Sequence, residues 1–284
     1  MGFVRHFRAC NNAVLPGGRL ALCIGDARVG WVRPDLAAVL GGRAAVTAEA
    51  VRIVDGGMLP ELARVAAAAG FGRHRGEAFD VRAQPGGAVL GEIDRGALPA
   101  FGIMAEGVHV NGLVRRADGL HVWVARRAAD EALDPGKLDH IVAGGTPAGL
   151  TPWETLIKEA AEEAAIPAAL AATARPVGTV CYAMERAEGL RRDVLHCYDL
   201  DLPEDFVPQA ADGEVESFAL WPVARVLATV RATEDFKFNV NLVLIDLFLR
   251  LGLVGGAEAD ELRRLQPSGG AAAMGISRAS APPG

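Results

Sequence analysis

The sequence predicts an α+β protein with two domains. Its 284 residues exceed the length of most single domains, and a hydrophobic content of 51% supplies enough apolar material for a core. Alternating runs typical of strands are mixed along the chain with amphipathic stretches typical of helices. We expect an accessory α+β domain over residues 1–105, a second domain over residues 106–255 and a flexible tail over residues 256–284, which is rich in Gly, Ala, Ser and Pro after Leu265.

The elements of the first domain follow from local patterns. Two alternating runs flank a Gly25-Asp26 turn and indicate paired strands, and a proline begins the short helix that follows. Leu59 and Leu62 fall on one face of a longer helix that Gly70 ends. The predicted order is strands at 19–24 and 28–32, helices at 35–40 and 58–69, and weaker strands at 79–81 and 88–90.

The second domain has clearer element boundaries. The segment Ala117-Asp118-Gly119 separates two alternating runs and is typical of a hairpin turn. The predicted order is strands at 108–115, 120–126 and 138–143, a helix at 152–165, strands at 177–184, 193–200 and 215–220, and helices at 222–230 and 239–251.

Charge and cysteine usage exclude several classes of function. The net charge of −6 argues against binding to nucleic acid or an anionic membrane, because both partners require a basic face. It is compatible with an anionic small molecule, since a bound divalent cation inverts the local field. The four cysteines have no C-x-x-C spacing, and the first residues lack the apolar run of a signal peptide. We therefore expect a cytoplasmic protein, for which a homodimer is compatible with the sequence.

The helix at 152–165 has a strong start signal. Thr151 is a good N-cap residue, Pro152 suits the first helical position, and Glu154 completes a capping box. Lys158 lies four residues after Glu154, so we expect these two side chains to form an ion pair along the helix.

Three carboxylates share one face of the same helix. Glu159, Glu162 and Glu163 stand at positions i, i+3 and i+4. A solvated acidic face would explain the pattern without any function. However, the charges repel one another and lie toward the helix C-terminus, where the macrodipole disfavours anions. A hard divalent cation would relieve both effects, and Mg²⁺, with Mn²⁺ as the alternative, binds carboxylate and phosphate oxygens together.

The residues around this helix resemble the Nudix box, G-x5-E-x7-R-E-U-x-E-E-x-G-U, in which U is apolar. The matching segments are Gly144 to Gly149 and Lys158 to Ile166. The chain departs from the box at Leu150, Lys158 and Ala165, which replace Glu, Arg and Gly respectively. The resemblance implies a Nudix α/β/α sandwich with a mixed sheet, a substrate-binding segment at Gly144 and Gly145, and Mg²⁺ ligands at Glu159, Glu162 and Glu163.

The resemblance extends to one branch of the family. Residues 123–127, 135–139, 212–216 and 236–239 are similar to the Nudix part of fungal thiamin pyrophosphokinase and to plant plastid Nudix hydrolases. It covers nearly the whole chain up to about Leu253 and implies Mg²⁺-dependent hydrolysis of a diphosphate linkage. Damaged thiamin diphosphate is the candidate substrate. A nucleotide-sugar or dinucleotide pyrophosphatase and a non-catalytic ligand sensor are the alternatives.

Further residues complete the expected site. Glu214 and Glu216 follow a turn and are expected on one face of a strand, where either could activate water. Arg126 and Lys237 are candidates for binding the substrate phosphates, with an ordinary surface role as the alternative.

We expect a few aromatic residues to form the pocket wall that contacts an organic ring of the substrate. Trp31 is the candidate in the first domain, with the domain core as the alternative location for its side chain. Trp123, Tyr182 and Phe238 are the candidates in the second domain. We expect His109, on an apolar strand, to be a buried histidine rather than a ligand.

Overall fold

The computed structural model describes residues 2–211 and 213–273. A seven-stranded sheet runs through the second half of the chain in the order β11-β12-β7-β8-β13, with β10 added beside β7 and β9 beside β8. The β12–β7 pair is parallel, whereas the other pairs are antiparallel. The expected mixed sheet is therefore confirmed.

The helices and strands of this sheet domain agree with most predicted ranges. They are β7 (Met104–Arg116), β8 (Gly119–Arg127), β9 (Leu138–Asp139), β10 (Val142–Gly145), α5 (Pro152–Ala164), α6 (Ala168–Ala171), β11 (Arg175–Arg186), β12 (Gly189–Asp201), β13 (Val215–Pro222), α7 (Val223–Ala232), α8 (Val240–Arg250) and α9 (Gly256–Ala273). The predicted strand at 138–143 is divided, because His140 and Ile141 separate β9 from β10.

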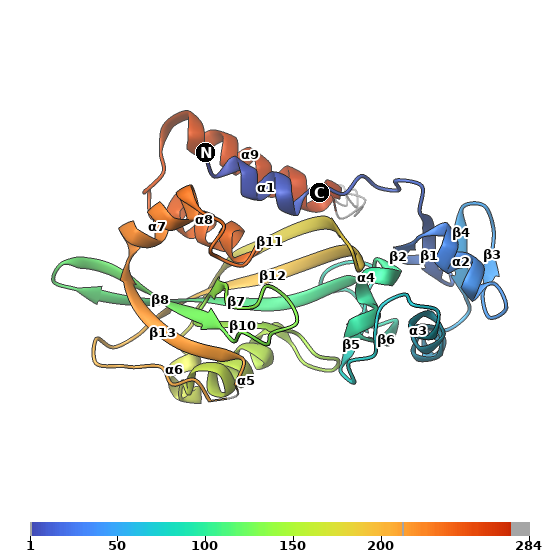
Figure 1. The fold of residues 1–284 in the computed structure, drawn as a ribbon, viewed down its shortest axis with the longest axis horizontal. Coiled ribbons are helices and arrows are strands. Elements are labelled where there is room, and N and C mark those ends of the chain that lie inside the picture. The colour runs from blue at the N-terminus through green and yellow to red at the C-terminus, as the bar shows by residue number, and fades with distance from the viewer. Residues whose placement is uncertain (1, 212, 274–284) are drawn as a thin grey trace, which may run out of the picture.

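Helices cover both faces of the seven-stranded sheet (Figure 1). On one face α5 and α6 pack through a core that contains Leu156, Ala160 and Ala171. On the other face α7, α8 and α9 pack through a core that contains Val243 and Leu262. This arrangement is an α/β/α sandwich, as expected, because each apolar sheet face must be buried against another layer.

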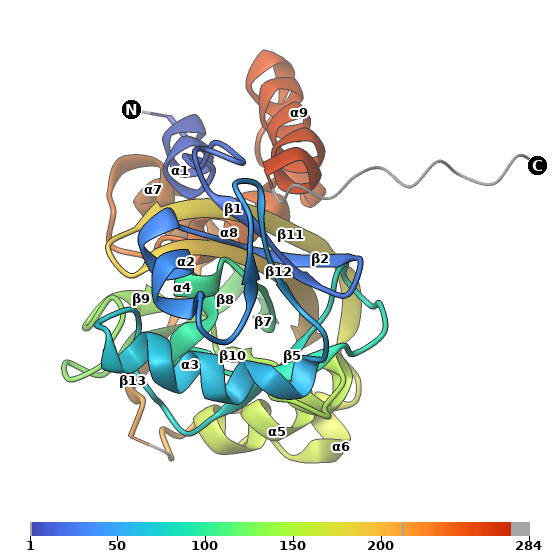
Figure 2. The same ribbon diagram turned by 90° about the vertical axis from the view of Figure 1, so that its right-hand side faces the viewer.

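The accessory domain lies beside one end of the sandwich (Figure 1) and faces the viewer in Figure 2. Its four-stranded sheet has the order β2-β1-β4-β3, and β5 and β6 form a separate hairpin. Its elements are β1 (Leu20–Ile24), β2 (Ala27–Val32), α2 (Pro34–Leu40), β3 (Ala45–Val46), β4 (Ala50–Ile53), α3 (Leu59–Ala68), β5 (Ala78–Val81), β6 (Gly91–Asp94) and α4 (Leu98–Phe101). The strand predicted at 88–90 is wrong by three residues, since the β5 partner begins at Gly91.

Both ends of the described chain belong to the sandwich rather than to separate units. Phe3, which precedes helix α1 (Val4–Cys10), and Phe7 within it are buried in the core that also contains residues of α8 and α9. Ala259 and Leu262 of α9 are buried in the same core, so the expectation of a flexible tail from residue 256 is wrong for its first part. The apolar residues at 259 and 262 are enough to dock a helix on the sheet domain. Residues 274–284 of the expected tail lie outside the described residues.

Candidate active site at the domain junction

A cavity of about 820 Å³ lies between the accessory domain and the sandwich. Acidic side chains from α5 and from the turn before β13 line one part of it, namely Glu159, Glu162 and Glu214. Arginines from the accessory domain and from β12 line another part, namely Arg73, Arg75, Arg95 and Arg191. The cavity therefore contains both groups that bind cations and groups that bind anions.

The capping box at the start of α5 forms as expected. The Thr151 hydroxyl accepts a hydrogen bond from Glu154 N at 3.2 Å, and the Glu154 carboxylate accepts one from Thr151 N at 2.9 Å. The expected Glu154–Lys158 ion pair is wrong. Lys158 Nζ instead contacts Glu159 Oε1 at 3.1 Å and Glu162 Oε2 at 2.5 Å. Glu154 is held by the cap, whereas the two later carboxylates lie within reach of the ammonium group.

The three carboxylates of α5 lie at different depths. The Glu162 side chain is half exposed, that of Glu159 is 15% exposed, and Glu163 is buried. Glu163 Oε2 accepts a hydrogen bond from Ala143 N at 2.8 Å, which joins α5 to β10. Burial raises the pKa of both Glu159 and Glu163, and at Glu163 the hydrogen bond from Ala143 and the charge of Lys237 oppose this effect. Burial thus makes it costly to keep these carboxylates charged without a cation.

Gly144 permits the close approach of α5 to β10. A Cβ atom at this position would lie 2.6 Å from both Cγ and Cδ of Glu159. At Gly145 a Cβ atom would lie 2.6 Å from Cζ of Phe79, a residue of β5 in the accessory domain. The two glycines therefore allow an acidic side chain and an accessory-domain ring to pack against the same segment.

The two acids near β13 do not share one role. A bulge between Val215 and Ser217 interrupts the alternation of side chains in the pairing with β8. Both acids are exposed, but Glu214 lines the cavity and repels Glu159 electrostatically, whereas Glu216 is absent from the cavity lining. Glu214 precedes β13 and Glu216 lies at the bulge, so of the two expected acids Glu214 lines the cavity.

The two basic residues predicted from the sequence lie in different places relative to the cavity. Arg126 is exposed, donates a hydrogen bond to Gly136 O at 2.9 Å, and does not line the cavity. Lys237 does line it, with its Nζ 3.3 Å from Asp139 Oδ2. Arg127, which the sequence argument passed over, reaches the cavity and pairs with Asp139 and Glu131. The side chains of consecutive strand residues point to opposite faces, and this determines which arginine lies inside.

A buried His–Asp–His group lies behind these cations. The possible ligand atoms of His109, Asp139 and His140 lie within 4.8 Å of one another. His109 Nδ1 and His140 Nδ1 are 2.9 Å apart, so one ring donates a hydrogen bond to the other. Burial lowers the pKa of His140 to about 4 and that of His109 well below its usual range. The Asp139 carboxylate already contacts Arg127 and Lys237, so electrostatics favour a neutral histidine pair over a metal ion here.

The aromatic candidates do not form the expected wall. Trp31 is 9% exposed, lies under the Arg28 guanidinium and is absent from the cavity lining. Trp123, Tyr182 and Phe238 are absent from it as well. The phenylalanine ring that lines the cavity belongs to Phe79, which was not among the expected residues. Each of the four expected rings fills space within a domain, and no sequence pattern marked Phe79, whose position depends on how the domains pack.

Comparison with known proteins identifies the second domain. The model of the NUDIX domain family matches residues 106–241. Residues 106–241 therefore match the NUDIX domain family, and we refer to this part of the chain as the NUDIX domain. The chain is 45% identical over 180 residues to two Arabidopsis thaliana proteins, "Nudix hydrolase 20, chloroplastic" and "Nudix hydrolase 24, chloroplastic". The matched segment is 63% of this chain and 48% and 49% of the two relatives, so the chain spans about half the length of the curated relatives it matches. The resemblance to plant plastid Nudix hydrolases is therefore confirmed.

A solved structure of a Deinococcus radiodurans protein is also similar to this chain. It has 22% sequence identity and a TM-score of 0.42, and the likeness covers 66% of this chain and 99% of that one.

These comparisons correct the expected location. Both plant relatives are named chloroplastic, which overturns the expectation of a cytoplasmic protein. Within the described residues, no helix is long and apolar enough to cross a membrane.

Proposed function

We propose that this protein is a metal-dependent pyrophosphohydrolase that cleaves a diphosphate linkage in a small organic molecule. The observation that carries the proposal is the convergence of Glu159, Glu162 and Glu214 on one cavity of the NUDIX domain. Acids from a helix and from a separate turn meet there, and a solvated acidic helix face would not require the second element.

The donor atoms fit a hard divalent cation. Glu159, Glu162 and Glu163 offer only carboxylate oxygens, which suit Mg²⁺ and also Mn²⁺. Lys158 Nζ contacts both Glu159 and Glu162, which supports the proposal that these carboxylates bind positive charge together. When bound, the metal would neutralise charge on the diphosphate and lower the pKa of a coordinated water.

The residues of the chain supply the remaining functions. Glu214 lies on the exposed edge of the cavity and is the acid we assign to proton removal from the attacking water, in preference to Glu216, which is outside the cavity. Gly144 lets Glu159 approach β10, and Glu163 is held in place by the Ala143 N–H. Lys237, held by Asp139, adds positive charge at the cavity wall.

The finer proposal concerns the substrate, which we infer to be a damaged form of thiamin diphosphate that is cleaved to the monophosphate. Phe79 offers an aromatic surface for a ring, and Arg73, Arg75 and Arg95 place positive charge around it. Like charges repel, so these arginines disfavour the cationic thiazolium of intact thiamin diphosphate and favour an oxidised ring without that charge. The volume of about 820 Å³ also accommodates a nucleotide sugar or a dinucleotide, which is the second candidate class.

The test measures Mg²⁺-dependent phosphate release from oxidised thiamin diphosphate, thiamin diphosphate and ADP-ribose. In Glu162→Gln we expect kcat to fall by about 100-fold or more, with stability changed by less than about 0.5 kcal/mol because only a surface ion pair is lost. Glu204→Gln, which alters an exposed acid of the NUDIX domain away from the cavity, is the matched control and should keep full activity.

Each outcome selects one function. Undiminished turnover in Glu162→Gln at saturating Mg²⁺ would remove the assignment of the helix acids. Preference for ADP-ribose would replace the thiamin proposal and leave the hydrolase proposal intact. Ligand-induced stabilisation of the wild-type protein without turnover of any substrate would indicate a sensor that has lost catalysis.

A further inference from the structure

The NUDIX half of the cavity has few cations free to bind a phosphate group. Arg127 uses its guanidinium on Glu131 and Asp139 and on the Leu133 carbonyl. Lys237 contacts the same aspartate, and Lys158 is shared between two glutamates of α5. A diphosphate bound near α5 would therefore need donors from another part of the chain.

The accessory domain presents such donors on the opposite side of the cavity. Arg73 and Arg75 lie in the loop between α3 and β5, and both line the cavity. Among the described residues neither side chain forms an ion pair or a side-chain hydrogen bond. Arg95 and Arg191 lie at the same wall but already have partners, Glu77 at 2.8 Å and Asp193 at 3.2 Å respectively.

Positive charge accumulates at this wall. Partial burial is the main reason that the pKa of Arg75 is lowered, and repulsion from Arg73, Arg95 and Arg191 lowers it further. Four guanidinium groups gathered at one cavity, two of them unpaired, disfavour each other unless an anion is present. An arginine fork matches phosphate oxygens in geometry as well as in charge.

The arginine loop is held in place by its own domain. The Asp94 carboxylate accepts hydrogen bonds from the backbone N–H groups of Arg75, Gly76 and Gly96 at 2.8 to 3.1 Å. Burial raises the pKa of Asp94, but these hydrogen bonds outweigh it and hold the pKa below its usual value. The loop is thus anchored at its backbone while its arginine side chains remain free.

The domain that carries the loop is fixed against the NUDIX segment that follows β10. Ala148 N donates a hydrogen bond to Ala78 O at 2.8 Å, and Phe79 packs over Gly145. Arg192 of β12 donates a hydrogen bond to Gly102 O at 3.0 Å from the other side of the junction. These contacts hold the arginine loop at a defined position relative to α5.

We propose that Arg73 and Arg75 bind the phosphoryl oxygens of the substrate's diphosphate, so that the accessory domain completes the substrate site. Arg95 and Arg191 add positive charge behind them. The inference rests on the proposed function for the identity of the ligand, but the binding of a diphosphate anion can be measured without catalysis.

The experiment titrates the full-length protein with inorganic pyrophosphate in the presence of EDTA and follows binding by calorimetry. We expect Arg73→Gln and Arg75→Gln each to weaken the Kd by roughly tenfold, since hydrogen bonds to a charged phosphate are strong. Arg75→Lys should lie between wild type and Arg75→Gln, because lysine keeps the charge but loses the fork. Arg43→Gln, an exposed arginine of the same domain outside the cavity, is the matched control and should bind within twofold of wild type.

The thermal midpoints of the variants separate binding from folding. The side chains of Arg73 and Arg75 form no ion pair or hydrogen bond among the described residues and lie among other arginines, so their substitution should not lower the midpoint. An unchanged Kd in both variants, an equal loss in Arg43→Gln, or no saturable binding of pyrophosphate by the wild type would each overturn the proposal.

The same measurements distinguish this inference from the proposed function. If the arginine variants lose pyrophosphate binding while the wild type shows no Mg²⁺-dependent cleavage, the anion site stands and the hydrolase proposal fails. If the wild type cleaves its substrate and the arginine variants bind pyrophosphate normally, only the arginine site fails.

Discussion

At the end of α5, Ala165 adopts a left-handed backbone conformation with φ of 51°. The Nudix box has glycine at this position, and a left-handed residue with a Cβ atom is strained by roughly 1–2 kcal/mol. Ala165 N still donates a hydrogen bond to Ala160 O and ends the helix in the usual way. Ala165 therefore adopts the left-handed backbone conformation that glycine adopts without strain.

We predict that Ala165→Gly stabilises the protein by about 0.5–1 kcal/mol, because relief of the strain exceeds the added backbone entropy of glycine in the unfolded chain. The free energy of unfolding in urea provides the measurement. Ala161→Gly, at an exposed position inside the same helix, is the control and should destabilise by about 1 kcal/mol. A loss of stability in Ala165→Gly would show that the conformation is not strained.

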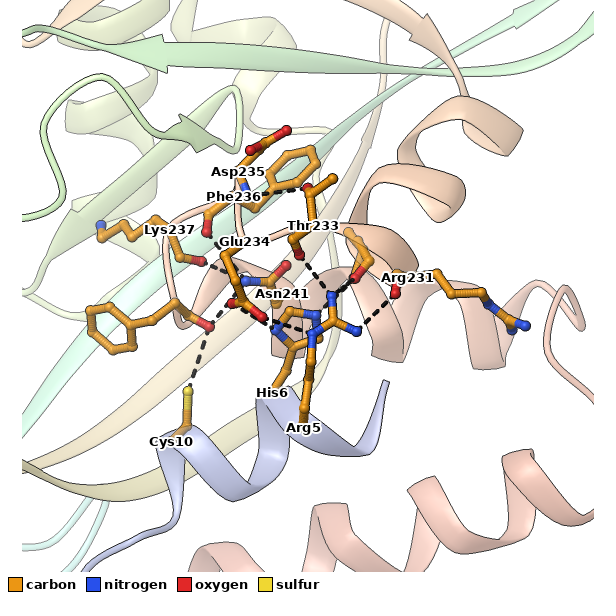
Figure 3. Close-up of polar contacts among 12 residues, drawn as sticks. Arg5, His6, Cys10, Arg231, Thr233, Glu234, Asp235, Phe236, Lys237 and Asn241 are labelled. Atoms are coloured by element: carbon orange, nitrogen blue, oxygen red, sulfur yellow. Dashed lines mark hydrogen bonds and ion pairs between the residues drawn. The ribbon is translucent and has the colours of Figure 1, made fainter. Parts of the chain in front are cut away.

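Among the elements, helix α1 contacts the C-terminal end of α7, which is far from it in the sequence. Arg5 donates hydrogen bonds to the carbonyl groups of Val230, Arg231 and Thr233 and pairs with Glu234 (Figure 3). These carbonyls are at the C-terminal end of α7, where four helix carbonyls lack intrahelical donors. The N-terminal helix thus caps α7 and orders the loop that leads to Lys237.

Arg5→Ala should lower the free energy of unfolding by about 2–3 kcal/mol, because several buried carbonyls lose a charged donor. It should also reduce kcat/KM for the substrate, since the loop carries Lys237 at the cavity wall. Arg8→Ala, an exposed arginine in the same helix, is expected to change neither quantity. Equal stability of the two variants in chemical denaturation would contradict the capping role.

At the scale of the whole molecule, His6, His109 and His140 are among the buried residues of the folded chain. His6 contacts the Val230 carbonyl, and His109 and His140 form the pair behind the cavity. Burial lowers the pKa of all three, and for His140 it lowers the pKa from 6.5 to about 4. At these three positions the unfolded chain therefore binds more protons than the folded chain below pH 6.5.

We predict that the contribution of these histidines to the free energy of unfolding is largest above pH 6.5 and falls as the pH is lowered. Each of these histidines contributes a slope of up to about 1.4 kcal/mol per pH unit, and the contribution of His140 levels off near its folded pKa of about 4. His140→Gln should reduce the slope between pH 6.5 and 4, whatever its effect on stability at pH 7. Urea unfolding at a series of pH values measures this slope. An unaltered slope in His140→Gln would contradict the prediction.

Local signals determined much of the NUDIX domain. The capping box at Thr151 and the spacing of Glu159, Glu162 and Glu163 define α5 and its acidic face, because helical geometry is set by residues a few positions apart. The hairpin of β7 and β8 followed from its turn residues in the same way. These features depend on interactions within one element or between neighbours in the sequence, so the sequence alone was sufficient.

The tertiary structure decided the composition of the cavity. The partner of Lys158, the separation of Glu214 from Glu216 by a bulge, and the place of Arg127 rather than Arg126 all depend on strand pairing and on how α5 meets the sheet. Phe79, Arg73 and Arg75 line the cavity because the accessory domain packs against the NUDIX domain. Such contacts join residues far apart in the chain, and their geometry follows from burial of apolar surface at the junction, which leaves no periodic signal in the sequence.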